Sequence, residues 1–390
     1  MWYHRDFLEY FTQGQEELLP IKVLKGPRQC GKTSLLAKLQ KYQMIYFDDL
    51  SVRQFAQENP KLFFDQLSGP LVLDEASLSP EIFPELKRRL DQERRSSTNK
   101  KLDIWITGSN QTLLQRDVRE SLAGRASYFD LNTLSLHELN SIDLSVYMMR
   151  GGWPELHIKP ELNPVRYLND LIATFIEKDI VSAAGIEKTA AFSKCLQLTA
   201  GRVGQLFNAS DIARNVGVEV LTVQSWLRLL EENAIVFSLM PYASNLNQRL
   251  IKTPKYYFLD VALAARLQGW NDYGPLQVSP AFGHLLENMA LGEIIRFFSN
   301  RGESAQIYFI RTKDQVEIDF LIQLPNQVYI AAEVKAKPQD FTQQQLKVLD
   351  SLGIRIKEKW ILSPIEGPKF ANAKTISFSE IWQSLNDNLV

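Results

Sequence analysis

The chain has 390 residues, of which 45% are hydrophobic and 23% charged, and its formal net charge is −1. This length predicts two or three domains of globular composition, while two cysteines exclude a disulfide framework. A net charge near zero excludes a global attraction to nucleic acid. No apolar run reaches the roughly 18 residues of a membrane span, and the N-terminus lacks a signal-peptide pattern, so we expect a cytoplasmic protein with no membrane partner.

A glycine-rich turn joins an apolar strand to an amphipathic helix within residues 23–39. Gly26, Gly31, Lys32 and Thr33 fit the spacing GxxxxGKS/T. Backbone NH groups of such a turn point at an anion, and the following helix adds its positive N-terminal end. Lys32 would contact the β- and γ-phosphates, and the Thr33 hydroxyl would ligate Mg²⁺. We therefore predict an ATP-binding loop made of Gly26, Pro27, Arg28, Gln29, Cys30, Gly31, Lys32, Thr33 and Ser34.

Two acidic residues, Asp74 and Glu75, follow a short strand that is apolar on both faces. Carboxylates at the end of a buried strand are costly unless a cation meets them. Asp74 could hold Mg²⁺ directly or through water, and Glu75 could polarise the water that attacks the γ-phosphate. Ser109 or Asn110, after the next apolar strand, could orient that water. The pattern predicts ATP hydrolysis with Lys32 and Glu75 as catalytic residues.

The segment SLAGRASYFDL places Arg125 directly after a glycine, between a helix and a fifth strand. Here the sequence resembles the AAA+ ATPases, in particular the prokaryotic branch in which an SLAGR-like segment precedes the last core strand. The resemblance implies that Ser109 or Asn110 is the first sensor, that Arg125 contacts the γ-phosphate in the ATP site, and that homo-oligomers form through this domain. A lone arginine at a helix end can also be a partner of the helix dipole.

A basic stretch at residues 87–101 carries seven basic and two acidic residues. One interpretation is the solvated side of a helix and its loop. The other is a contact with DNA phosphates, which would weaken steeply with salt. The candidate contacts are Arg88, Arg89, Arg94, Arg95, Lys100 and Lys101.

The middle of the chain begins after a Gly- and Pro-rich stretch at residues 150–164, which indicates a boundary. A helix is predicted over residues 165–181, followed by a short helix, a turn at Gly217, a longer helix over 220–232 and a strand. This order looks like a winged helix-turn-helix. The longer helix offers only Arg228 as an exposed basic residue, so DNA readout and a protein contact both stay open.

A β-hairpin is predicted over residues 316–335, with Val316, Ile318, Phe320 and Ile322 on one face. If its loop is residues 325–327, Leu324 pairs with Val328 and Asp319 lies opposite Glu333, close to Lys335. If Leu324 pairs with Gln327 instead, the two carboxylates fall on opposite faces.

The first register would create a catalytic site from Asp319, Glu333 and Lys335. The carboxylates, with Glu287 from the preceding helix, could hold Mg²⁺, and Lys335 could position or activate a water. Asp319, the EVK at 333–335 and Glu287 resemble the PD-(D/E)xK nuclease superfamily. The order of all segments, with TPKYYFLD before the hairpin, resembles a prokaryotic architecture in which an AAA+ core precedes a nuclease-like domain of unassigned function.

We therefore expect an α/β protein with an AAA+ P-loop domain at residues 1–155, a helical segment with a winged helix-turn-helix at 156–255, and a restriction-endonuclease-like α/β domain at 256–390. The expected cofactors are ATP and Mg²⁺, and the expected partner is DNA. One hypothesis is an ATPase that couples its nucleotide state to a DNA-processing, Mg²⁺-dependent nuclease domain. The alternative is a regulatory ATP switch whose inactive nuclease-like domain only binds DNA or a protein.

Overall fold

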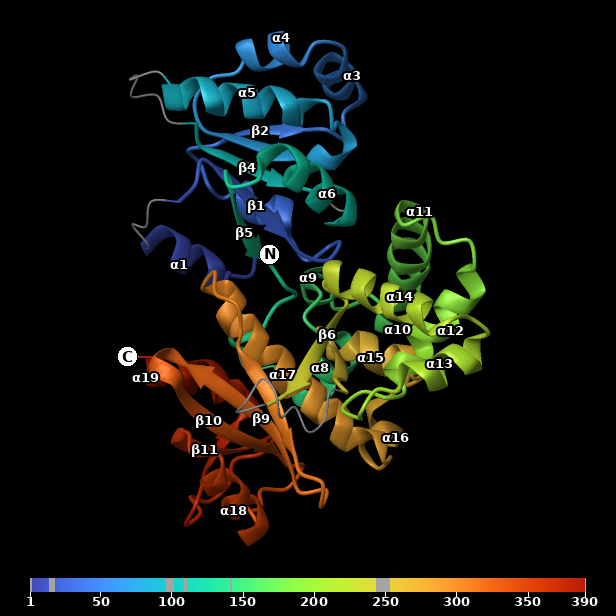
Figure 1. Ribbon diagram of the computed structural model, residues 1–390, viewed down its shortest axis with the longest axis vertical. Helices are drawn as coiled ribbons and strands as arrows, with labels where there is room; N and C mark the ends of the chain where they lie inside the picture. The colour runs from blue at the N-terminus through green and yellow to red at the C-terminus, as the bar shows by residue number, and fades with distance from the viewer. Residues whose placement is uncertain are drawn as a thin grey trace.

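The computed structural model describes residues 2–13, 18–95, 102–108, 111–140, 142–242 and 253–389. In Figure 1, a parallel sheet lies at the top, a second sheet at the lower left and a group of helices at the right. Helix α1 (Asp6–Gln13) contacts the long helix α17 (Ala281–Asn300), which links the upper and lower parts. Within the described ranges, no helix is both long and apolar enough to cross a bilayer.

The upper sheet has five parallel strands in the order β2-β3-β4-β1-β5. Its central strands are buried on both faces, as expected for a parallel sheet covered by helices, and they confirm the predicted α/β fold of this part. The strands are β1 (Ile21–Lys25), β2 (Gln43–Tyr46), β3 (Leu71–Asp74), β4 (Ile104–Thr107) and β5 (Ala126–Asp130). The helices are α2 (Lys32–Leu36), α3 (Leu50–Glu58), α4 (Pro60–Asp65), α5 (Ile82–Arg95) and α6 (Gln111–Leu122), with the 3₁₀ turn η1 (Ala76–Leu78).

The middle of the chain is helical, and the two helices predicted on either side of Gly217 are present. Gly217 ends α13 in the left-handed conformation that glycine favours at a helix C-terminus, with φ of 74°. The predicted helix over 165–181 is present and includes nine π-helical residues. The elements are α7 (Leu136–Leu139), α8 (Leu144–Arg150), α9 (Pro154–Ile158), α10 (Pro164–Leu171), the π-helix Ile172–Ile180, α11 (Val181–Ala183), α12 (Thr189–Ala200), α13 (Ala209–Val216) and α14 (Val220–Glu232).

The lower sheet has seven strands in the order β12-β11-β10-β9-β8-β6-β7. Clusters of buried apolar side chains lie on both of its faces. The strands are β6 (Val236–Pro241), β7 (Lys255–Phe258), β8 (Ile307–Arg311), β9 (Glu317–Leu324), β10 (Val328–Val334), β11 (Arg355–Ser363) and β12 (Lys374–Ser377). The other elements are α15 (Val261–Leu267), α16 (Tyr273–Gln277), α17, η3 (Pro325–Gln327), α18 (Gln343–Ser351), η4 (Phe378–Glu380) and α19 (Ile381–Leu389).

Strand β6 joins the middle of the chain to this C-terminal sheet. Met240 pairs in parallel with Tyr308 of β8, and Val236 pairs antiparallel with Phe258 of β7. One hydrophobic core therefore extends from the middle helices into the C-terminal sheet. The expected boundary between residues 255 and 256 falls at the start of β7.

The predicted common face of the first hairpin strand is wrong for Ile318. This side chain packs with Leu321 in one cluster, whereas Phe320 packs in the cluster on the opposite face. The pairing between β8 and β9 shifts register between Tyr308 and Ile310. Such a bulge interrupts the strict alternation on which the prediction depended.

Candidate functional site

Left-handed backbone dihedrals shape the phosphate loop between β1 and α2. Gly26 and Gly31 have φ of 147° and 98°, which favours glycine at both positions. A Cβ atom at Gly26 would lie 2.0 Å from the carbonyl oxygen of Leu131. The Cys30 thiol donates to this same oxygen at 3.3 Å. The loop therefore packs directly on the segment that leaves β5.

Lys32 is the first residue of α2, and its ammonium group turns back over the loop. Its Nζ donates to the carbonyl oxygens of Gly26 and Pro27 at 2.8 and 2.9 Å. The side chain is buried, with 7% of its surface exposed. These carbonyl contacts hold the charge beside the anion-binding amides, where a phosphate would be its natural partner.

Thr33 and Asp74 meet at the ends of α2 and β3. Thr33 Oγ1 lies 3.0 Å from both carboxylate oxygens of Asp74, and Thr107 Oγ1 donates to Asp74 Oδ1 at 2.6 Å. Burial raises the pKa of Asp74, whereas the two hydroxyl hydrogen bonds lower it. One hydroxyl and one carboxylate fit Mg²⁺, which usually takes one or two protein ligands together with substrate phosphates and waters.

Glu75 follows Asp74 in a left-handed backbone conformation, with φ of 57°. Its NH group donates to Thr107 Oγ1 at 3.2 Å. Non-glycine residues rarely adopt this conformation, and it concentrates at functional sites. The turn directs the chain so that Glu75 lines the cavity beside the phosphate loop.

This cavity has a volume of about 1150 Å³ and lies between the parallel-sheet domain and the middle helices. Its volume is slightly above the usual upper limit for ligand pockets, about 1,000 Å³. Phe175 and Ile180 of the π-helix give it an apolar wall, and the Tyr167 hydroxyl donates to Gln29 Oε1 at 2.7 Å across it. From the predicted loop, the cavity is lined by Arg28, Gln29, Gly31, Lys32, Thr33 and Ser34.

The two candidate sensor residues, Ser109 and Asn110, lie outside the described residues. Gln111 follows them, and sequence reasoning missed it. Its Nε2 donates to the carbonyl oxygens of Gly26 and Gly108 at 3.1 and 2.6 Å, so it fixes the phosphate loop to the end of β4. A polar side chain four residues after this strand was the available signal.

Arg125 lies at the edge of the sheet opposite the phosphate loop. It precedes Ala126, which pairs with Ile21 at the start of β1, whereas the loop follows the other end of β1. Its Nε and Nη2 donate to Asp91 Oδ1 at 3.1 and 2.6 Å. Strand register therefore places Arg125 away from the phosphate loop of its own chain, and its predicted contact with a γ-phosphate stays a prediction.

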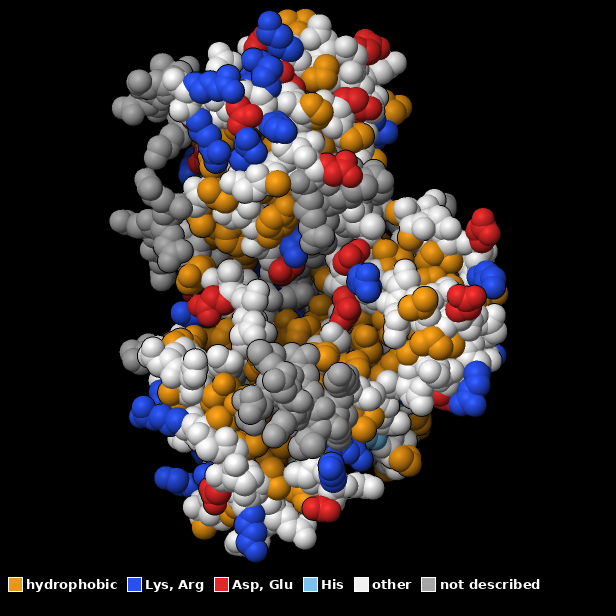
Figure 2. Space-filling model, viewed as in Figure 1, with side chains coloured by type: hydrophobic (Ala, Val, Ile, Leu, Met, Phe, Trp, Pro, Cys, Tyr) orange, Lys and Arg blue, Asp and Glu red, His pale blue; other side chains and the backbone are white. Residues whose placement is uncertain are grey.

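Figure 2 shows Lys and Arg side chains gathered at the top of the molecule, over the parallel-sheet domain. Within the predicted basic stretch, Arg88 and Arg89 both pair with Glu85, and Arg89 also pairs with Asp65. Lys100 and Lys101 lie outside the described residues. DNA binding by this stretch, or by Arg228 on α14, stays a prediction.

In the C-terminal hairpin, the first predicted register is confirmed. Leu324 pairs with Val328, and the regular ladder ends just before Asp319. There the NH group of Asp319 donates to Glu333 Oε1 at 3.2 Å, and Lys335 Nζ donates to Glu333 Oε2 at 2.7 Å. The predicted trio of Asp319, Glu333 and Lys335 therefore comes together.

Sequence reasoning missed the buried cation of this cluster, Lys255 on β7. Its Nζ lies 3.1 Å from Glu287 Oε1 and also pairs with Glu317, while the Tyr257 hydroxyl donates to Glu287. Burial raises the pKa of Glu287 to about 8, and the nearby charge of Asp319 adds to the shift. Lysine and tyrosine two apart in a strand were the only local signal.

The predicted Mg²⁺ site of Glu287, Asp319 and Glu333 is not formed. Across the ranges that the structure describes, no three His, Cys, Asp or Glu side chains are arranged to hold a metal ion. Each of these carboxylates has a partner within the chain. Glu287 contacts Lys255, Glu333 contacts Lys335, and Asp319 Oδ2 accepts from the NH group of Val334 at 2.8 Å.

Comparison with known families agrees with the phosphate site. Residues 19–140 match the family described as AAA domain, while residues 141–274 and 282–374 match two domains of unknown function, DUF8612 and DUF4143. The AAA match, the five-stranded parallel sheet and the phosphate loop define the N-terminal region as a P-loop domain of the AAA ATPase type.

Three proteins similar to about four fifths of the chain are described as uncharacterized proteins. Those of Mycobacterium tuberculosis and Mycobacterium bovis are each 27% identical over 313 residues, 80% of this chain and 69% of theirs. One of Haemophilus influenzae is 25% identical over 343 residues, 79% of this chain and 80% of its own. Among solved structures, the Walker-type ATPase PABY2304 of Pyrococcus abyssi aligns at 14% identity with a TM-score of 0.42, covering 67% of this chain and 95% of that one. Cdc6p of Pyrobaculum aerophilum aligns at 15% identity with a TM-score of 0.24, covering 60% and 83%.

Proposed function

We propose that the protein binds and hydrolyses ATP at the phosphate loop and passes its nucleotide state to the C-terminal sheet domain. The observation that carries this proposal is that Lys32, Thr33 and Glu75 line one cavity, while Asp74 lies within hydrogen-bond distance of Thr33. Cation, hydroxyl, buried carboxylate and second carboxylate are the parts that phosphoryl transfer to water requires.

In the proposed reaction, the loop amides and Lys32 bind the phosphates, and the Lys32 ammonium exchanges its carbonyl partners for phosphate oxygens. Thr33 and Asp74 would hold Mg²⁺, which would neutralise charge on the phosphates. Thr107 orients the Asp74 carboxylate through its hydroxyl. Glu75 orients the attacking water and takes its proton, and the apolar wall at Phe175 excludes other water from the site.

The first link from this site to the rest of the molecule is Arg5. Its Nη1 donates to the carbonyl oxygen of Cys30 in the phosphate loop at 2.9 Å. Its Nη2 donates to the carbonyl oxygen of Asn132 at 2.8 Å, and its Nε pairs with Glu138 at 2.9 Å. Because Arg5 is buried and makes all three contacts, a shift of the loop changes the position of the segment after β5.

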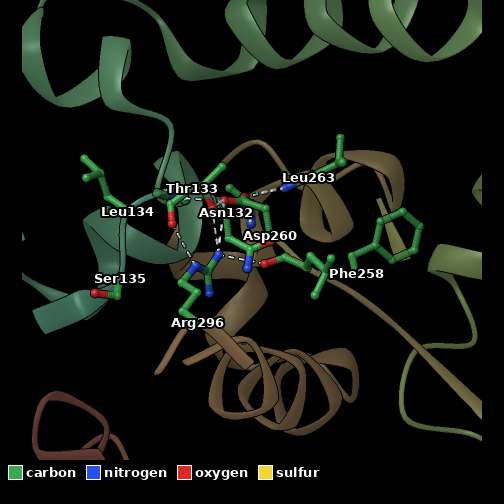
Figure 3. Close-up of polar contacts among 12 residues, drawn as sticks. Asn132, Thr133, Leu134, Ser135, Phe258, Asp260, Leu263 and Arg296 are labelled. Carbon is green, nitrogen blue, oxygen red and sulfur yellow. Dashed lines mark hydrogen bonds and ion pairs between the residues drawn. The ribbon is translucent and has the colours of Figure 1, made fainter. Parts of the chain in front are cut away.

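The second link joins this segment to helix α17, as Figure 3 shows. Arg296 Nη2 donates to Thr133 Oγ1 at 2.8 Å, and Thr133 Oγ1 donates to Asp260 Oδ2 at 3.0 Å. Glu293, one turn earlier on α17, accepts from the NH group of Leu136 at 2.8 Å. Buried and hydrogen-bonded networks of this kind resist small independent displacements of their members.

Helix α17 also carries Glu287, which belongs to the C-terminal carboxylate cluster. A loop movement at the nucleotide site can therefore reach this cluster through packed elements. We propose regulation of a DNA or protein contact as the output, because the carboxylates that cleavage would require are bound by side chains and backbone of the same chain.

The test compares Glu75→Gln with Glu81→Gln, a matched change at an exposed carboxylate outside the cavity. Glu75→Gln should keep ATP binding and lower turnover by about 100-fold or more, whereas Glu81→Gln should match the wild type. ATP-loaded Glu75→Gln should also change amide hydrogen exchange in residues 131–139 and in α17. Unchanged turnover would contradict hydrolysis at this site, and unchanged exchange at saturating ATP would contradict the coupling.

A further inference from the structure

The C-terminal cluster contains more charged groups than the predicted trio. Four carboxylates belong to it, from Glu287, Glu317, Asp319 and Glu333, and three cations face them, from Lys255, Arg311 and Lys335. With every group ionised, the formal net charge is −1. A divalent cation therefore meets little uncompensated negative charge.

Lys255 is the most deeply buried of the three cations, with none of its surface exposed. Its Nζ contacts Glu287 and Glu317 and lies 5.3 Å from the centre of the Phe309 ring. A buried ammonium is very costly without carboxylate partners. Lys255 and the carboxylates therefore stabilise one another's charged forms.

The backbone fixes Lys255 in this place from both sides. It pairs with Leu239 of β6 on one side and forms a bridge with Leu206 on the other. The ammonium can leave the cluster only if β7 moves or the long side chain finds another buried anion.

Several of the carboxylate oxygens that a metal would need already accept from cations or a hydroxyl of the same chain. Glu287 accepts from Lys255 and Tyr257, and Glu317 accepts from Arg311 at 2.6 Å. Mg²⁺ needs oxygen ligands at about 2.0–2.1 Å in near-octahedral geometry, so an ion bound at these same oxygens would compete with the ammonium and guanidinium groups for them. The donor set in this arrangement does not fit the ion that the nuclease resemblance implies.

We propose that Lys255 is an internal counter-cation that takes the place of a divalent metal, so that the C-terminal cluster holds the sheet together and does not cleave phosphodiesters. The inference is independent of ATP hydrolysis, since the phosphate loop lies in another domain. Removing the ammonium lowers the formal charge of the cluster from −1 to −2, which a divalent cation would match.

The decisive experiment titrates the full-length protein with Mn²⁺ in the absence of nucleotide. Wild type and Lys374→Met, a control at an exposed lysine of β12, should lack a C-terminal Mn²⁺ site. Lys255→Met should gain a site that binds Mn²⁺ at least tenfold more tightly than the wild-type protein does. Adding Glu287→Gln to Lys255→Met should remove this site. A wild-type Mn²⁺ site that disappears in Asp319→Asn would overturn the proposal, as would a folded Lys255→Met protein that gains no site.

A second measurement decides the question if Lys255→Met does not fold. Wild type and Lys335→Ala are incubated with supercoiled plasmid and single-stranded DNA, with Mg²⁺ or Mn²⁺ and ATP. Absence of cleavage, or equal residual cleavage by both proteins, supports the proposal. Cleavage by the wild type that Lys335→Ala abolishes would show an active nuclease and overturn it.

Discussion

The two acidic sites of this molecule contrast in what their carboxylates contact. At the phosphate loop, Asp74 is held by two hydroxyl groups and lies next to Glu75, which lines a large cavity. In the C-terminal cluster, Glu287 and Glu333 contact lysines of the same chain. At the first site Asp74 contacts hydroxyl groups and Glu75 lines a cavity that a ligand can enter, whereas at the second site two carboxylates contact lysine ammonium groups.

The contrast shows that acidic residues in the right order do not by themselves define a metal site. Replacing a buried ion pair by apolar residues is often neutral for stability, but removing one partner is strongly destabilising. The internal pairs of the C-terminal cluster therefore limit what the chain can lose there. In our proposal these ion pairs give the cluster a structural role. The phosphate site, in contrast, faces a cavity that a substrate can enter.

The largest expected effect is at Lys32, and it tests the phosphate site. Lys32→Ala removes the cation from the phosphate loop, so ATP turnover should fall by about 100-fold or more and ATP affinity should also fall. Lys61→Ala, at an exposed lysine of α4, should leave both unchanged. Steady-state hydrolysis and equilibrium ATP binding measure the two effects, and a Lys32→Ala protein with normal turnover would contradict the site.

Gly152→Ala should disturb the segment around Leu134, which connects the phosphate-loop domain to helix α17. A Cβ atom there would lie 2.0 Å from the carbonyl oxygen of Leu134, in the segment that contacts α17. Overpacking typically costs about 1–3 kcal/mol, and we expect a loss near the upper end in urea unfolding. Gly283→Ala, with open space around it, should be neutral or stabilising. Equal unfolding midpoints for the two variants would contradict the close packing.

Thr107→Val tests how Asp74 is held at the phosphate site. It removes the hydroxyl that donates to Asp74, so kcat should fall by about tenfold, roughly the value of one hydrogen bond to a charged group. Because this bond lowers the pKa of Asp74, its loss should raise that pKa and move the acid limb of the pH–rate profile to higher pH. Thr107→Ser should restore both values; an unmoved limb would exclude Asp74 as the titrating group.

The smallest expected effect concerns His137, which links α1 to α19. Its hydrogen bond to Asp6 raises its pKa above 6.5, and its ring stacks on Trp382 at 4.1 Å. The stabilisation is therefore complete below pH 6.5 and is lost as the pH rises through the folded-state pKa. Between pH 6 and 8, wild type should lose up to about 1 kcal/mol relative to His137→Gln. Identical pH dependence in urea unfolding would contradict a charged pair.

Local sequence patterns predicted the features that depend on neighbours in the chain. The spacing from Gly26 to Thr33 predicted the phosphate loop, and the sequence reduced the hairpin to two registers, of which the one with the 325–327 turn is present. The order of helices around Gly217 was also correct. In each case the interacting residues lie within a few positions of one another, so that turn geometry and periodicity determine the result.

Contacts between distant segments could not be predicted in this way. Lys255 meets Glu287 and Glu317 only because β7 lies at the edge of a sheet in which every strand except β6 comes later in the chain. Arg125 illustrates the same limit, since the pairing of Ala126 with Ile21 decides which edge of the sheet it occupies. Such placements depend on tertiary register, which a single sequence does not contain.

The continuous C-terminal sheet restricts how the polypeptide can be divided. A fragment ending at residue 255 would keep β6 but lose β8 and most of β7, and so would present unpaired backbone groups along both edges of that strand. Exposed strand edges of this kind promote aggregation. Insertions, gene fusions and truncations should therefore spare residues 236–377, which contain every strand of this sheet, and the ATPase end of the chain is the better place for such engineering.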